Sequence, residues 1–258
     1  MIRRLQNIIS KIIPAVAIFI LLAVWQILCM AEVVPSYMLP SPVQVVRAFA
    51  GDFTLLMGHA VVTLSEAALG MAIGVIGGFL ISALMEHYNV LYKALYPILV
   101  ITQTIPTVAI APLLVLWLGY DMAPKVTLVV IMTFFPIAVG LLDGYKEADP
   151  DAIRLMQAMG ASKFQIFRHI KMPGSLSHFF AGLRLSVSYG VVGAVISEWL
   201  GGFAGLGVYM TRVKKSYAYD KMFAVIFLIT LISLLLMKCV DLIQKLVTPW
   251  SNSSKKKA

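Results

Sequence analysis

The chain has 258 residues, of which 60% are hydrophobic and only 13% are charged, and its net charge is +9. Soluble domains carry about 45–50% apolar and about 25% charged residues, so this composition excludes a disordered chain and argues against an ordinary soluble enzyme. In so apolar a chain the excess of lysine and arginine indicates loops facing anionic lipid and no nucleic-acid groove.

Stretches poor in charge predict an all-α polytopic membrane protein with about six transmembrane helices, because a spanning helix needs roughly 20 apolar residues. They are residues 12–31, 67–85, 94–120, 126–142, 176–197 and 222–243, and the fifth is complete only if Arg184 is tolerated inside it. The first is too long for a signal peptide and is interpreted as an uncleaved anchor. The third is too long for one straight crossing and contains three prolines, so we expect it to be kinked or partly interfacial.

The distribution of lysine and arginine predicts the orientation. With both termini in the cytoplasm, most of these residues fall on the cytoplasmic side. We therefore expect a multi-pass protein of a prokaryotic plasma or inner membrane, in which residues 1–258 form a single transmembrane domain and residues 251–258 a disordered basic tail. The cluster at Arg212, Lys214 and Lys215 opposes this orientation locally.

Two short signals accompany the first spans. Ser41 can cap a short helix whose first residue is Pro42, which we expect to lie at the membrane surface. Gly70, Gly74 and Gly78 repeat at a spacing of four and predict close helix packing, within one subunit or between two.

The most informative segment is the predicted cytoplasmic loop 143–175. Asp149 followed by Pro150 predicts a helix start, Gly160 a stop, and Ser162 the cap of a second helix over residues 163–170 that ends at Pro173. An amphipathic helix–turn–helix displayed on a helical bundle is expected to dock a soluble partner; the alternative is a helix that lies on the lipid.

These residues resemble a known family. Gly160-Ala161-Ser162, followed by Ile170-Lys171-Met172-Pro173, is similar to the "EAA" loop of binding-protein-dependent ABC transporter permeases, with the family's spacing from Gly to Ile and to Pro. The nitrate/sulfonate/taurine branch of that family is also similar in three further motifs, which are Leu39–Pro42, Pro106 with Pro112 before Leu116–Gly119, and Glu198 with Gly205-Leu206-Gly207.

The resemblance implies a permease that works as a pair, a homodimer or a heterodimer, with two ATPase subunits docked below and an extracytoplasmic substrate-binding protein above. The loop would couple ATP hydrolysis to transport through Asp151, Arg154, Met156, Gly160, Ala161, Phe164, Ile170 and Pro173. Arg154-Leu155-Met156 stands where the family has Glu-Ala-Ala. Either the ATPase contact has changed sign, or Asp151 or Glu147 substitutes.

No catalytic chemistry is predicted in the chain itself. It lacks the Gly-x4-Gly-Lys-Ser/Thr motif that cradles phosphates, so energy is expected from a partner. No cofactor or metal site is expected, and solvated or interfacial positions are predicted for all four histidines, His59, His87, His169 and His178.

Polar residues within the spans are candidates for the translocation pathway, with interhelical hydrogen bonding as the alternative. They are Gln103, Thr104, Ser186, Ser188 and Tyr189, with Glu198 at the outer mouth. Glu66 and Arg184 lie at different depths and are not expected to pair. Arg212 and Lys214 are candidates either for binding-protein docking or for anchoring at lipid headgroups.

The substrate is expected to be a small organic solute. The run from Glu198 to Ala224 resembles permeases for thiamine-pyrimidine precursors or riboflavin. The alternatives are a sulfonate, taurine or nitrate importer and a vitamin-capturing membrane subunit of an energy-coupling transporter.

Overall fold

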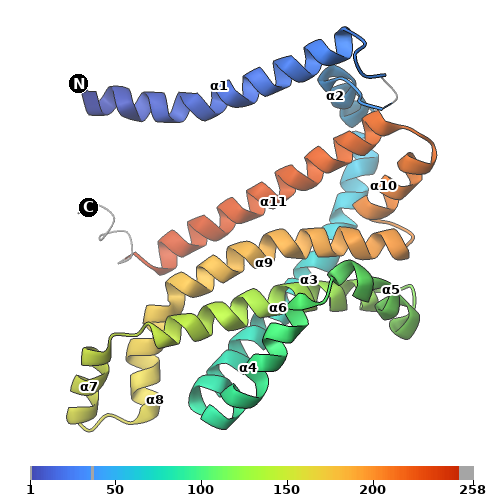
Figure 1. Ribbon diagram of the computed structural model, residues 1–258. Coiled ribbons are helices and arrows are strands. Elements are labelled where there is room, and N and C mark those ends of the chain that lie inside the picture. The colour runs from blue at the N-terminus through green and yellow to red at the C-terminus, as the bar shows by residue number, and fades with distance from the viewer. Residues whose placement is uncertain (1, 36–37, 250–258) are drawn as a thin grey trace. The chain divides into compact units, whose positions relative to one another are not determined.

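The computed structural model describes residues 2–35 and 38–249, and their regular structure is entirely helical (Figure 1). The all-α prediction is therefore confirmed. The chain separates into two compact units, one made of Met1–Gly58 and Tyr209–Leu228 and the other of His59–Val208 and Ile229–Ala258. The predicted tail 251–258 lies outside the described residues.

The first unit contains α1 (Ile2–Met30), α2 (Pro42–Gly51) and the start of α11 (Tyr219–Val247). Trp25 of α1 stacks on Phe227 of α11 with ring centroids 6.0 Å apart. The predicted start of α2 is confirmed, because the Ser41 hydroxyl accepts a hydrogen bond from the Gln44 backbone and the Gln44 side chain accepts one from the Ser41 backbone. This reciprocal cap satisfies two backbone donors that the helix cannot pair.

The second unit is built on α3 (Phe53–His87), α6 (Met122–Lys146) and α9 (Met172–Leu200), and α6 and α9 run side by side (Figure 1). The predicted glycines lie at the contact between α3 and α6. A Cβ atom at Gly78 would lie 2.9 Å from the Phe134 carbonyl oxygen, so only glycine lets the two backbones approach this closely. The glycines therefore serve packing within one chain.

The expected third span is broken. Helices α4 (Asn89–Thr104) and α5 (Thr107–Leu118) meet at an angle of 100°. Pro106 caps α5, and because proline has no backbone N–H it cannot continue the hydrogen-bond ladder of α4. The predicted kink is thus confirmed as a sharp bend at this proline.

Four helices are long and apolar enough to cross a membrane, or five if the α4–α5 pair is one span. The four are α3, α6, α11 and the helix that runs through Lys163–Leu200. In the described residues the apolar part of α1 is Val16–Met30. Six spans therefore stay a prediction.

The predicted end of the second helix of the loop, at Pro173, is wrong. After α7 (Pro150–Ala158), the helix α8 (Lys163–Ile166) passes into a π-helical segment η1 (Phe167–Lys171) and directly into α9. In the wider π turn the Met172 N–H donates to the Phe167 carbonyl, five residues back. Proline lacks a backbone donor, but in the first turn of an α-helix that donor has no partner within the helix. Pro173 therefore lies in the first turn of α9, where it was expected to end the preceding helix.

Candidate functional site

Local sequence fixes the geometry of the hairpin formed by α7, the turn 159–162 and α8. Asp149 Oδ1 accepts from the Asp151 N–H at 2.9 Å, and Pro150 opens α7. At the other end Gly160 has φ +78°, its N–H bonds to the Gln157 carbonyl, and the Ala161 N–H bonds to the Met156 carbonyl. This is a Schellman closure, which glycine adopts without strain.

The second arm of the hairpin starts from a reciprocal cap and is anchored at its base. Ser162 caps α8 as predicted, and the Gln165 side chain completes the reciprocal cap. Ile166 is buried, the Phe167 ring meets the buried Tyr145 ring edge-on at 5.2 Å, and Lys171 forms an ion pair with Glu86 at the end of α3. Because these contacts fix the base to α3 and α6, the hairpin is held as one rigid projection.

The tip of the hairpin exposes large apolar side chains. Leu155 is 63% exposed, Met159 74% and Phe164 62%. In Figure 1 the labels α7 and α8 lie beyond the ends of α6 and α9, away from the helical bundle of this unit. Exposed apolar side chains on an anchored element are typical of a surface that a partner covers.

The predicted coupling residues occupy different parts of this hairpin. Asp151 and Arg154 form an exposed ion pair of 3.4 Å along α7. Met156 and Ala161 are half-buried near the turn, whereas Ile170 and Pro173 are half-buried at the base. Two acids were expected as substitutes for the glutamate of the EAA loop. Glu147 contacts His178 at 3.1 Å, and Asp151 contacts Arg154.

Two of the predicted pathway residues lie together. Gln103 of α4 and Tyr189 of α9 line two adjoining cavities of about 360 Å³ and about 190 Å³. Thr104 is exposed and its hydroxyl donates to the Ile101 carbonyl of its own helix, while Ser188 is half-buried. Gln103 and Tyr189 thus line both cavities, whereas Thr104 and Ser188 line neither of them.

Ser186 is fully buried, and its hydroxyl donates to the Thr133 carbonyl of α6. This contact is the interhelical hydrogen bond that the sequence left open as the alternative. Glu198 is only 2% exposed, so its carboxylate does not line an open mouth in this structure.

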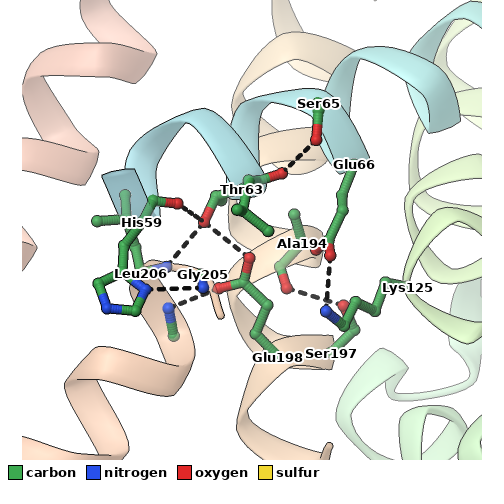
Figure 2. A network of polar contacts seen from close by, with 12 residues as sticks. His59, Thr63, Ser65, Glu66, Lys125, Ala194, Ser197, Glu198, Gly205 and Leu206 are labelled. Atoms are coloured by element: carbon green, nitrogen blue, oxygen red, sulfur yellow. Dashed lines mark hydrogen bonds and ion pairs between the residues drawn. The ribbon is translucent and has the colours of Figure 1, made fainter. Parts of the chain in front are cut away.

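Glu198 belongs to a buried polar network that ties the glycine-rich turn before α10 (Leu206–Lys215) to α3 and α9 (Figure 2). Thr63 donates to Glu198 Oε1 at 2.7 Å and accepts from the Leu206 N–H at 2.8 Å. The Gly207 N–H donates to Glu198 Oε2, and the Gly205 N–H donates to His59 Nδ1. The expectation of a solvated His59 is therefore wrong, because His59 is buried as the acceptor for this turn.

Two charges within the helices are paired with an opposite charge. Glu66 binds Lys125 at 2.6 Å, and both side chains are almost fully buried. Arg184 bonds to Asp241 at 3.0 Å and to Gln244 at 2.6 Å on α11. Glu66 and Arg184 do not pair with each other, as expected from the sequence, and the partner of each lies on another helix.

Arg212 and Lys214, the candidate docking residues, are exposed on α10. No group of three His, Cys, Asp or Glu side chains in the described part of the chain is arranged to hold a metal ion.

The chain matches a family described as "Binding-protein-dependent transport system inner membrane component" over residues 70–252. The formylaminopyrimidine transport permease protein ThiX of Halalkalibacterium halodurans is 36% identical, with 92% of this chain and 95% of the relative covered. The riboflavin transport system permease protein RibX of Chloroflexus aurantiacus is 30% identical, with 92% and 90% covered.

Among solved structures, an inward-facing conformation of the MetNI methionine ABC transporter aligns with a TM-score of 0.64. Its sequence identity is 20%, and the alignment covers 75% of this chain and 97% of that chain. At this identity the likeness concerns the fold.

Proposed function

The chain belongs to the binding-protein-dependent inner membrane components of ABC transporters, and from that premise we propose that it forms the solute pathway of an importer driven through the α7–α8 hairpin. It is the permease component and not the ATPase, and it is a multi-pass protein of the bacterial inner membrane. Permeases of this kind pair with ATPase subunits and with binding proteins. This membership decides against a vitamin-capturing subunit of an energy-coupling transporter.

The observation that carries the proposal is the exposed apolar tip of a hairpin with a fixed base. Leu155, Met159 and Phe164 offer an apolar surface to a partner, while Phe167 and Lys171 connect the same element to α6 and α3. A push on the tip is therefore transmitted to the helices of the bundle. The ATPase is the partner that has mechanical work to transmit.

The remaining arrangement follows from the sequence. We assign the whole chain to one permease domain with six spans, in which α1 is the first and the bent α4–α5 pair the third, and both termini are cytoplasmic. Two copies of the chain pair with two ATPase subunits. The binding protein docks on the opposite face, where Arg212 and Lys214 of α10 meet its acidic residues.

The solute assigned to this importer is a pyrimidine of the thiamine-precursor type. The 36% identity to a formylaminopyrimidine permease over nearly the whole chain supports this choice. A sulfonate such as taurine is the second candidate, because the motifs of that branch are present in the sequence.

Uptake by the reconstituted transporter tests the function. The permease is assembled with its ATPase in proteoliposomes, and the binding protein and labelled formylaminopyrimidine are added. We expect accumulation that requires both ATP and the binding protein, and little accumulation of taurine. Pyrimidine accumulation that persists without the ATPase subunit would contradict the proposal.

A further inference from the structure

Two adjoining cavities in the second unit meet at the same pair of side chains. The larger one, about 360 Å³, lies between α4, α6 and α9, and the smaller one, about 190 Å³, extends toward the α4–α5 bend. Gln103 and Tyr189 line both. Ligand sites for small molecules begin at roughly this size.

The polar groups that line these cavities differ in whether they are available to a solute. The Thr102 hydroxyl donates to the Leu99 carbonyl, and the His178 ring bonds to Glu147. Within the described residues, neither the Gln103 amide nor the Tyr189 hydroxyl makes a hydrogen bond, and both side chains are exposed. These two groups are therefore free to bind a solute.

The charged residues that line the cavities also discriminate between solutes. No lysine or arginine lines either cavity, and Asp143 is the one acid that does. A sulfonate or nitrate ion would leave water without gaining a positive partner, and it would meet a negative carboxylate. A second copy of the chain would contribute the same uncharged pair. The cavities thus disfavour anions.

The chemistry of the pair matches one class of uncharged ligand. A glutamine amide presents a donor and an acceptor side by side. An amino group beside a ring nitrogen is complementary to this amide, because the amino group donates and the ring nitrogen accepts. Glutamine and asparagine recognise the edge of adenine in the same way. A tyrosine ring offers a flat face for stacking and a hydroxyl at its rim.

We propose that Gln103 and Tyr189 form a solute-selective subsite of the membrane pathway for an uncharged aminopyrimidine-type ring, with Gln103 binding the amino–nitrogen edge and Tyr189 the ring face. This inference rests on the proposed importer function and deepens it. The permease then contributes to selectivity in addition to the binding protein.

The test uses the complete transporter, with ATPase and binding protein, and measures uptake of labelled formylaminopyrimidine together with ATP hydrolysis. Gln103→Ala and Tyr189→Ala are expected to lower the amount transported per ATP about tenfold, since a lost bidentate pair or ring stack has an effect of this order. Tyr189→Phe keeps the stacking face and is expected to retain most uptake. Tyr88→Ala, a half-exposed tyrosine that lines neither cavity, is the matched control and should transport like wild type.

Retained stimulation of ATP hydrolysis by the loaded binding protein shows that each variant is folded and coupled. Wild-type transport per ATP in both alanine variants would overturn the subsite while leaving the importer function intact. Efficient ATP-driven uptake of nitrate by the wild-type protein would overturn the exclusion of anions, again without affecting the importer function. ATP-driven uptake of neither probe would overturn the pyrimidine assignment and the subsite together.

Discussion

At the scale of single residues, two charges within the helices of the second unit have a partner of opposite charge on another helix. Glu66 with Lys125 and Arg184 with Asp241 join segments that are 59 and 57 residues apart. Sequence reasoning identified Glu66 and Arg184 as costly charges but not what neutralises them. The reason is that a partner across the bundle follows from helix packing, which a linear pattern does not contain.

The Glu66–Lys125 pair gives a sharp stability prediction. Lys125→Met leaves the buried Glu66 without its partner and is expected to cost about 3–5 kcal/mol. The double variant Glu66→Gln with Lys125→Met removes both charges and should recover most of that loss. Thermal unfolding in detergent measures both, and a double variant no more stable than the single one would refute the argument.

We expect the stability of the fold to depend on pH through Asp52, which lies between α2 and α3. Hydrogen bonds from Lys221 and then from Tyr209 hold the pKa of Asp52 below its ordinary value of 3.8. A carboxyl whose pKa is lower in the folded state stabilises the fold above its unfolded pKa, and that stability is lost as the pH falls through the lower folded value.

Asp52→Asn should therefore destabilise the protein by about 1 kcal/mol at pH 7, the low end for charge-assisted hydrogen bonds at a partly exposed site. The gap between variant and wild type should be constant from pH 5 to pH 8 and shrink below about pH 4. Melting temperatures across this range check it. A gap that narrows near neutral pH would assign the effect to another group.

At the scale of elements, the sequence predicts what short-range chemistry determines. The caps at Ser41, Asp149 and Ser162 and the turn at Gly160 are all found as expected, because each depends on residues within a few positions. The passage of the helix through Pro173 was not predicted. Next to that proline the Phe167 ring of the π turn packs against Tyr145 of α6, a contact between residues far apart in the chain that short-range rules do not contain.

Gly160 offers a test of the hairpin that leaves its contacts untouched. A Cβ atom there would meet nothing within 4 Å, but φ is +78°, so Gly160→Ala adds backbone strain of about 1–2 kcal/mol. We expect reduced coupling, seen as weaker stimulation of ATP hydrolysis by the loaded binding protein, with little change in overall melting.

Gly174→Ala is the matched control, because it has the same open surroundings inside the helix α9. It should couple normally and be slightly more stable, by about 0.5–1 kcal/mol. Equal stimulation in the two variants would mean that the turn geometry at Gly160 does not affect coupling.

At the scale of the whole molecule, composition alone placed the chain in a membrane, and the family match and the long apolar helices agree with that placement. The candidate pathway was only partly predicted. Gln103 and Tyr189 meet at cavities, whereas Ser186 and Glu198 serve internal packing. A polar side chain on a helix can line a cavity or form a hydrogen bond to another helix. Which of the two it does depends on how α3, α6 and α9 pack, and this packing is not contained in the sequence pattern.

The central claim is that the exposed tip of the α7–α8 hairpin contacts the ATPase. Site-specific photocrosslinking from a benzoylphenylalanine at position 164, in membranes that contain the assembled transporter, tests it most directly. The same probe in place of Leu69, an exposed apolar residue on α3, is the control. We expect a covalent adduct of permease and ATPase from position 164 and none from position 69. An adduct of position 164 with the binding protein, or no ATPase adduct in a transporter that imports its solute, would contradict it.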